Sequence, residues 1–294
     1  MTACHRRRFL GLLGSGVAAG IAGCGAVGQS RVRALVAGSL QAAASETLQT
    51  TTRPELAVEA HGSVHAARLV ADGKRDPHVL ALADPELFER LLSAPWYAIV
   101  ASNELVLAYN PETPGGRRVA EAESWTAPLG RADVSLGRTD PDLDPLGYRT
   151  IFALELAARR RDDPGFAASV LSPDQRYPET QLLAQFETGS IDAAFVYRSM
   201  AVERDYPFRE LPPAVNLGDP AYADSYADVQ YELPDGTVAR GAPIEYAATR
   251  RADDAETRRV FETLLAGAWL RDHGFLVRDQ YPRMEGDVPN GLRG

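Results

Sequence analysis

Residues 138–150, RTDPDLDPLGYRT, are the stretch around which the chain is organised. The loop DPLGYRT at 144–150 leads directly into an apolar-periodic run at 151–158, which predicts a loop that ends in a helix start. Pro145 sets φ for a first helical turn, and Gly147 lets another backbone come close. The free N–H groups of such a turn carry partial positive charge and suit a bound anion. A plain Asx-Pro turn with an N-cap is the alternative, so the neighbouring stretches decide between the two.

The first 23 residues indicate an export signal. Arg6 and Arg7 open the sequence RRRFL, a small and apolar run covers 11–23, and IAGC places a cysteine at position 24. This pattern is typical of a twin-arginine lipoprotein signal peptide at 1–23, after which Cys24 carries lipid and 24–30 form a tether. An uncleaved membrane anchor is the alternative. The only other cysteine, Cys4, leaves with the signal, so neither a disulfide nor a thiol nucleophile is expected in the mature chain.

The composition is acidic and almost free of lysine. The signal holds three of the 31 basic residues and none of the 40 acidic ones, so its removal takes the net charge from −9 to −12. Lys74 is the single lysine, and the other cations are arginines. Such a surface fits a high-salt environment, where salt screens the self-repulsion. It argues against a nucleic-acid partner, which needs a basic surface, but not against a small anionic ligand.

The same construction occurs twice near the start of the mature chain. Apolar runs at 33–36 and 56–60 predict strands, and each is followed by Gly-Ser and a helical pattern. A strand that feeds a small-residue turn and a helix places backbone N–H groups and a hydroxyl at a ligand.

Strands and helices alternate along the rest of the chain, which predicts an α/β fold. Further strands are expected at 79–84, 97–101, 104–109, 134–138, 191–197 and 243–249, helices at 85–92, 118–122, 148–160, 179–188 and 253–270, and a hairpin at 229–240. The tail from 272 has no clear pattern.

Four motifs in order resemble a known family: AGSL at 37–40, GSV at 62–64, DPxGYRT at 144–150 and LAQFETGSIDAAFVYRSMA at 183–201. Together they resemble the archaeal tungstate/molybdate-binding proteins of ABC importers, over residues 33–270. The resemblance implies a two-lobed, type II periplasmic-binding-protein fold: two mixed sheets flanked by helices, with two crossings between lobes, near 106–110 and 240–244. Lobe 1 would comprise 31–107 and 243–294, and lobe 2 would comprise 108–242.

The resemblance also implies which residues bind the oxyanion. These are the serines of the two Gly-Ser turns, the DPxGYR loop, a glutamate before the last motif's strand and that motif's tyrosine: Ser39, Ser63, Asp144, Pro145, Leu146, Glu179 and Tyr197. Glu187 competes with Glu179, because it precedes Gly189 in the same motif, but a helix start faces the cleft more readily than a helix end, which favours Glu179. The family has no catalytic residues and no cofactor. Its partner is a membrane permease, so we expect a monomer held by lipid at the outer face of the cell membrane.

The chemistry of these residue types is consistent with an oxyanion. Hydroxyls and helix N-termini are neutral donors, so no arginine or lysine is required. Two carboxylates, Asp144 and Glu179, would repel an anion unless their oxygens bind the tungsten or molybdenum centre directly. Those metals can expand to six ligands, whereas sulfur and phosphorus do not readily do so, so such a site would reject sulfate. Asp144 could instead be a helix cap only, and Arg149 is expected to cap or to pair with a carboxylate.

Other functions stay open at this point. The ligand could be sulfate, phosphate or an organic anion. Asp144 and Glu179 could be the acid/base pair of a secreted hydrolase, or the chain could be a purely structural surface lipoprotein. The histidines show no metal-binding spacing.

Overall fold

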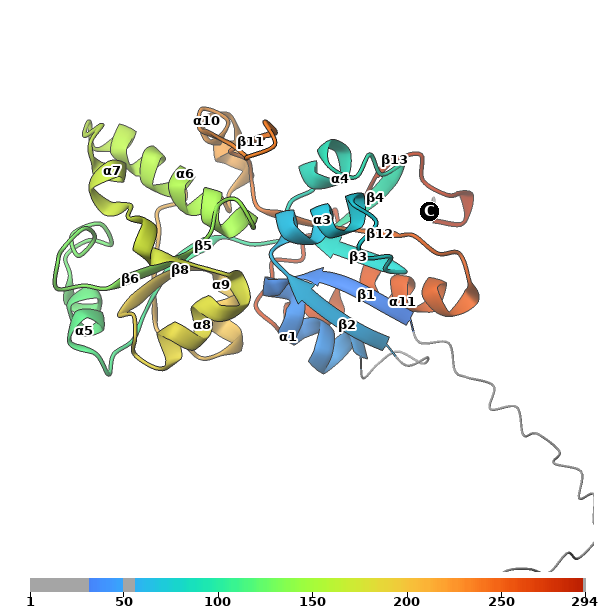
Figure 1. Cartoon of the computed structure of the whole chain (residues 1–294), viewed down its shortest axis with the longest axis horizontal. Helices are drawn as coiled ribbons and strands as arrows, with labels where there is room; N and C mark the ends of the chain where they lie inside the picture. Colours follow the sequence, from blue (N-terminus) through green and yellow to red (C-terminus); the bar gives the residue numbers. More distant parts are fainter. Residues whose placement is uncertain (1–31, 50–55, 293–294) are drawn as a thin grey trace, which may run out of the picture.

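The computed structural model describes residues 32–49 and 56–292, so the predicted signal, Cys24 and the tether lie outside the described residues. Two sheets lie side by side along the long axis of the molecule (Figure 1). We call the elements around the six-stranded sheet the first lobe and those around the five-stranded sheet the second lobe. The predicted α/β class with two mixed sheets is confirmed.

The first lobe has the strand order β13-β4-β12-β3-β1-β2. Strands β1 (Val32–Ala37), β2 (Leu56–His61) and β3 (Val79–Leu82) are parallel, and β12 (Glu245–Arg250) runs antiparallel to β3 and β4 (Trp96–Ser102). Because parallel strands end at the same edge, the residues after β1, β2 and β3 meet there. The helices of this lobe are η1 (Gly38–Leu40), α1 (Gln41–Ala43), η2 (Ala44–Leu48), α3 (Ser63–Ala71), α4 (Glu86–Arg90), α11 (Ala255–Leu265), α12 (Ala268–Arg271) and η5 (Asn290–Leu292).

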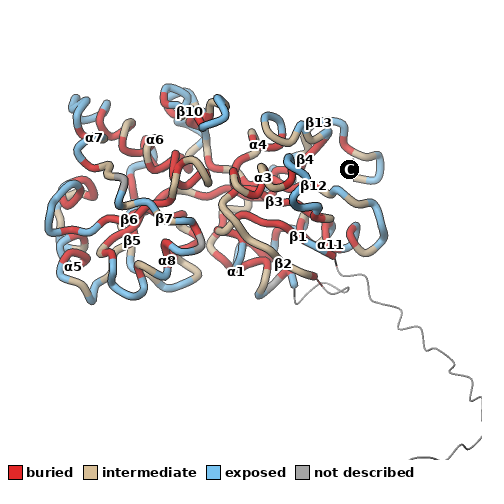
Figure 2. The backbone as a smooth tube through the Cα atoms, viewed as in Figure 1, coloured by how far each residue is buried: buried red, intermediate tan, exposed pale blue. Residues whose placement is uncertain are grey.

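The second lobe has the order β7-β6-β8-β5-β9: β7 (Arg176–Tyr177), β6 (Leu136–Thr139), β8 (Ala193–Tyr197), β5 (Leu105–Tyr109) and β9 (Phe208–Glu210). Around it lie α5 (Pro114–Glu121), α6 (Pro145–Arg160), α7 (Phe166–Val170), η3 (Pro173–Gln175), α8 (Glu179–Glu187), α9 (Arg198–Glu203), η4 (Pro220–Tyr222) and α10 (Ala223–Tyr226). The predicted hairpin is β10 (Gln230–Glu232) with β11 (Val238–Arg240). Both lobes bury apolar strands beneath helices that are exposed on their outer faces (Figure 2).

The chain passes between the two sheets at two points. The first is Asn103 and Glu104, between β4 and β5, which is earlier than the predicted 106–110. The return path leaves the second sheet after β9, passes through the separate hairpin β10–β11 and enters β12 through 241–244. The two crossings touch, because Asn103 N donates to Ile244 O at 3.2 Å.

Two local predictions were wrong. The helix expected at 118–122 begins at Pro114, where Thr113 Oγ1 accepts from Gly116 N. The helix expected at 253–270 is interrupted at Gly267, whose φ of 68° belongs to the left-handed region. The tail adds the strand β13 (Arg283–Gly286) to the edge of the first sheet, antiparallel to β4. Among the described residues, no helix is both long enough and apolar enough to cross a membrane.

Candidate ligand-binding site between the lobes

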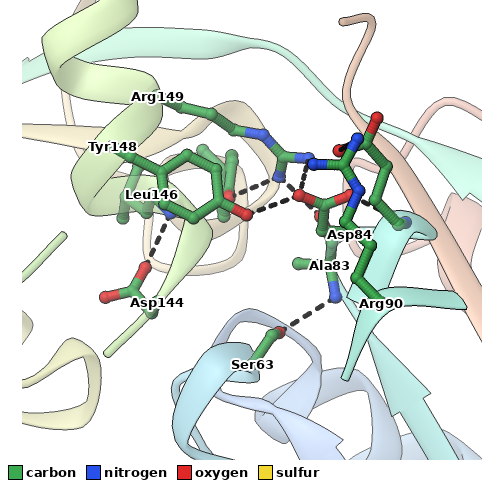
Figure 3. Close-up of polar contacts among 10 residues, drawn as sticks. Ser63, Ala83, Asp84, Arg90, Asp144, Leu146, Tyr148 and Arg149 are labelled. Carbon is green, nitrogen blue, oxygen red and sulfur yellow. Dashed lines mark hydrogen bonds and ion pairs between the residues drawn. The ribbon is translucent and has the colours of Figure 1, made fainter. Parts of the chain in front are cut away.

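The two Gly-Ser turns lie at the carboxyl edge of the first sheet. Ser39 follows β1 in η1, and Ser63 is the first residue of α3, directly after β2. Ser63 Oγ accepts from Ala83 N at 3.0 Å (Figure 3), and Ser39 Oγ accepts from the Tyr246 hydroxyl at 3.0 Å. Both serines are buried.

Asp144 faces this edge from the second lobe. It is the N-cap of α6, and its Oδ1 accepts from Leu146 N at 2.7 Å (Figure 3), so the predicted helix start is confirmed. Pro145 and Leu146 form the first helical turn. Gly147 permits the expected close approach, because a Cβ there would lie 2.5 Å from Pro141 N. The second oxygen of Asp144, Oδ2, is buried without a partner at hydrogen-bond distance, and the nearby Thr139 hydroxyl, which is also buried and unpaired, acts to lower the pKa of Asp144.

Glu179, the first residue of α8, connects the two lobes. Its carboxylate accepts from Gly38 N at 3.0 Å and from Ser39 N at 3.1 Å. Its rival Glu187 lies at the other end of α8, is exposed, and accepts from the Tyr206 hydroxyl. Both glutamates line a cavity of about 150 Å³. The geometry therefore brings Glu179, and not Glu187, onto the first Gly-Ser turn.

Tyr197 ends β8 and is fully buried. Its hydroxyl accepts from Arg149 Nη1 at 2.8 Å, and the same nitrogen donates to Ala83 O at 2.5 Å. Arg149 also lies 3.8 Å from Asp84, so it pairs with a carboxylate as expected. The Tyr148 hydroxyl donates to Asp84 at 2.5 Å (Figure 3).

The lobes meet closely at the glycines of the two turns. A Cβ on Gly38 would lie 2.5 Å from Glu179 Oε2, and one on Gly62 would lie 2.6 Å from Asp144 Cβ. His65 N donates to Leu143 O at 2.9 Å in the same region. The predicted residues of the two lobes are thus brought to one buried place.

The two carboxyl groups interact there. Burial raises the pKa of Asp144 to about 7. Burial, and then the charge of Asp144, raise the pKa of Glu179 well above its ordinary value. Burial acts to lower the pKa of Arg149, but Tyr197 and Asp84 outweigh it and hold that pKa above its ordinary value. Arg149 is thus a buried cation that pairs with Asp84 and whose charge acts to lower the pKa of Asp144.

A family model described as bacterial extracellular solute-binding protein matches residues 32–276. The chain belongs to this family of solute-binding proteins. A Haloferax volcanii protein, provisionally named an ABC transporter molybdenum-binding protein, is 57% identical over 97% of this chain and 95% of its own length. The molybdate/tungstate-binding protein of Thermococcus kodakarensis is 30% identical over 80% of this chain and 76% of its own length.

Two solved structures share the fold of this solute-binding protein. The periplasmic molybdate-binding protein of Azotobacter vinelandii matches with a TM-score of 0.56 and 13% identity, covering 84% of this chain and 99% of its own. The substrate-binding domain of a molybdenum ABC transporter from Clostridium difficile, itself provisionally named, matches with a TM-score of 0.53 and 15% identity, covering 85% of this chain and 99% of its own. At these identities the likeness concerns the fold alone.

The family and the relatives of higher identity are substrate-binding proteins. The protein is therefore a binding protein and not an enzyme, and the hydrolase alternative is ruled out.

Sequence reasoning missed several residues of this solute-binding protein's site. Asp84 follows β3, as Ser39 follows β1 and Ser63 follows β2, so the strand-end argument could have included it. Tyr148 belongs to the DPxGYR motif but was given no role, and Asn103 gave no signal, because their contacts depend on which elements of the two lobes meet. Within the described residues, no group of three or more His, Cys, Asp and Glu is arranged to hold a metal ion.

Proposed function

We propose that this protein captures tungstate or molybdate between its lobes, outside the cell, and delivers it to the permease of an ABC transporter. Lipid on Cys24 would hold it at the membrane. The names of its relatives support the ligand class. We assign ligand binding to the residues predicted from the sequence: Ser39, Ser63, Asp144, Pro145, Leu146, Glu179 and Tyr197.

The observation that carries the proposal concerns three hydroxyls. The oxygens of Ser39, Ser63 and Tyr197 each accept a hydrogen bond from a group behind them: Tyr246, Ala83 N and Arg149 respectively. Because a hydroxyl has a single proton, each of these three can direct that proton to a further acceptor. Three buried donors without formal charge suit an oxyanion's oxygens.

The unpaired Oδ2 of Asp144 supports direct ligation of the metal centre. A buried carboxylate oxygen without a partner is costly, and a Lewis-acidic tungsten or molybdenum atom would satisfy it. Glu179 would be the second such ligand. Sulfate and phosphate offer no such centre, so they would meet only the repulsion of the two carboxylates.

A thermal melt tests the proposal. We expect tungstate and molybdate to raise the unfolding midpoint, since ligand at a hundredfold excess over Kd stabilises the fold by about 2.7 kcal/mol, and sulfate and phosphate to leave it unchanged. Asp144→Ala and Glu179→Ala should lose the ligand-induced rise, and the control Glu187→Ala should keep it. If sulfate or phosphate raised the midpoint instead, the ligand would be that anion, and no rise with any oxyanion would refute the ligand assignment.

The anchor is tested separately. Cys24→Ser should release the protein into the medium, while Cys4→Ser, which changes only the predicted signal, should leave it with the membrane fraction. Fractionation of cells producing each variant, followed by immunoblotting, measures this. Retention of the Cys24→Ser protein on membranes would contradict lipid attachment at that residue.

A further inference from the structure

Tyr246 links one of the proposed ligand serines to the crossing between the lobes. It lies on β12 and is fully buried. Its hydroxyl donates to Ser39 Oγ at 3.0 Å and accepts from Asn103 Nδ2 at 3.4 Å. Asn103 is also fully buried and is the first residue after β4, where the chain leaves the first lobe.

Asn103 is bonded to both lobes and to the other crossing. Its Nδ2 donates to Ser199 Oγ at 2.8 Å, and its Oδ1 accepts from Ser199 N at 3.3 Å. Ser199 lies two residues after Tyr197, in the first turn of α9. The backbone N–H of Asn103 donates to Ile244 O at 3.2 Å. One buried residue therefore joins the first crossing to the second crossing, to Tyr246 of the first lobe and to α9 of the second lobe.

From these contacts, and resting on the proposed function, we infer that Tyr246 and Asn103 are positioning residues that set the direction of the Ser39 hydroxyl and couple it to the crossing. With Asn103 donating to its oxygen, Tyr246 directs its own proton to Ser39 Oγ. Ser39 then keeps its own proton, which interacts with the Glu179 carboxylate here and which an oxyanion would accept when bound. Buried hydrogen-bond chains of this kind hold side chains in one arrangement, because an alternative leaves a polar group unpaired. Neither positioning residue touches the ligand.

The test is a double-mutant cycle on tungstate affinity, measured by calorimetry. Tyr246→Phe removes one hydroxyl and keeps the ring, and we expect the Kd to rise about three- to tenfold, as for the loss of one hydrogen bond. In the Ser39→Ala background the same change should alter the Kd less than about twofold, because it acts through Ser39. The matched control is Tyr97→Phe, in the neighbouring strand β4, whose hydroxyl bonds Glu89. It should leave the Kd unchanged.

A second cycle tests Asn103. Asn103→Ala should weaken binding, and its effect should shrink when Tyr246→Phe is already present; the ligand-free unfolding midpoint of each variant is measured to separate lost folding from lost affinity. Independent effects of Tyr246→Phe and Ser39→Ala, or no effect of Tyr246→Phe, would overturn the relay while leaving the proposed function standing. A wild-type chain that binds neither tungstate nor molybdate would refute the proposed function, and the relay with it.

Discussion

The two carboxylate oxygens of Asp144 have different roles. Oδ1 accepts a hydrogen bond from Leu146 N and so caps α6, which is the purely structural role that an Asx-Pro turn predicts. Oδ2 has no partner and lies in a buried site that also holds Glu179. A single residue thus serves the fold with one atom and leaves the other for chemistry. The cap interpretation and the ligand interpretation are therefore compatible.

The raised pKa of Asp144 predicts how the ligand-free protein responds to pH. The folded pKa, about 7, exceeds the ordinary 3.8, so the folded state binds more protons between these values. Stability from this group is fully present below pH 3.8 and is lost as the pH rises through about 7. The loss should be on the order of 4 kcal/mol, given about 1.4 kcal/mol for each unit of pKa shift between 3.8 and about 7.

Chemical unfolding of ligand-free protein at a series of pH values measures this. Asp144→Asn removes the titrating group and should flatten the decline across the window from pH 4 to 8. The relevant quantity is the difference in unfolding free energy between the two proteins at each pH. All other titrating groups are the same in both, and only Glu179, whose pKa depends on Asp144, should titrate differently. Parallel curves for wild type and variant would contradict the assignment.

Elements meet at this site through their ends. The turns after β1 and β2 contact the first residues of α8 and the cap of α6, so backbone groups of one lobe reach side chains of the other. Glycine allows this, because any side chain at these positions would occupy the space of the facing lobe.

Gly62→Ala should hold the lobes apart. Its Cβ would lie 2.6 Å from Asp144 Cβ and 2.7 Å from Leu143 O, neither of which can give way without moving α6. Overpacking costs about 1–3 kcal/mol, so we expect tungstate to bind at least about fivefold more weakly. Gly165→Ala, where the nearest atom would be 3.7 Å away, is the control. Titration calorimetry compares the two, and equal affinities would show that the lobes do not need this contact.

The strand ends were predictable from the sequence because each has a local signal. Ser39, Ser63 and Glu179 lie where apolar runs end or helical periodicity begins, and the structure places all three at the boundary between lobes. Their ligand role remains a prediction. The first crossing was misplaced because no breaker separates β4 from β5; the Pro-Gly cluster comes only after Tyr109.

Other parts of the site could not be predicted. Arg149, on α6 of the second lobe, bonds Ala83 O of the first lobe, and this contact exists only once the lobes have met. Tyr246 and Ser39 share the first lobe but lie 207 residues apart in the chain, so their contact exists only once the first sheet is complete. The strand β13, RMEG, lacks the alternation of a half-buried strand, because it lies at an edge with exposed or half-buried side chains. Hydrophobic periodicity predicts the secondary structure of a segment and which of its faces is buried. It does not predict which distant segment the residues will contact.

At the scale of the whole molecule, the excess of acidic charge predicts a response to salt. The full chain carries a formal charge of −9 with 40 acidic residues. Each exposed ion pair adds at most about 1 kcal/mol to the free energy of unfolding, and salt weakens it. Salt also screens the repulsion among the excess acidic side chains, which stabilises the fold.

We therefore expect the unfolding midpoint to rise as salt increases from about 0.1 M to about 2 M, with potassium and sodium chloride alike. Scanning calorimetry of ligand-free protein measures it. Chloride salts are chosen so that the added anion is not an oxyanion that could stabilise the protein by binding at the site. A midpoint that falls with salt would mean that the surface pairs outweigh the repulsion.

The close contact between the lobes also limits how fast a bound ion can dissociate. The serines, carboxylates and tyrosine that are proposed to bind the ligand are at most 4% exposed, and backbone hydrogen bonds such as His65 N to Leu143 O span the lobes. A captured ion can then leave only as fast as the lobes part, whatever the strength of its own bonds. Under the proposed function, residence time would depend on how fast the lobes separate, and a permease would hasten unloading by spreading the lobes rather than by competing for the ion.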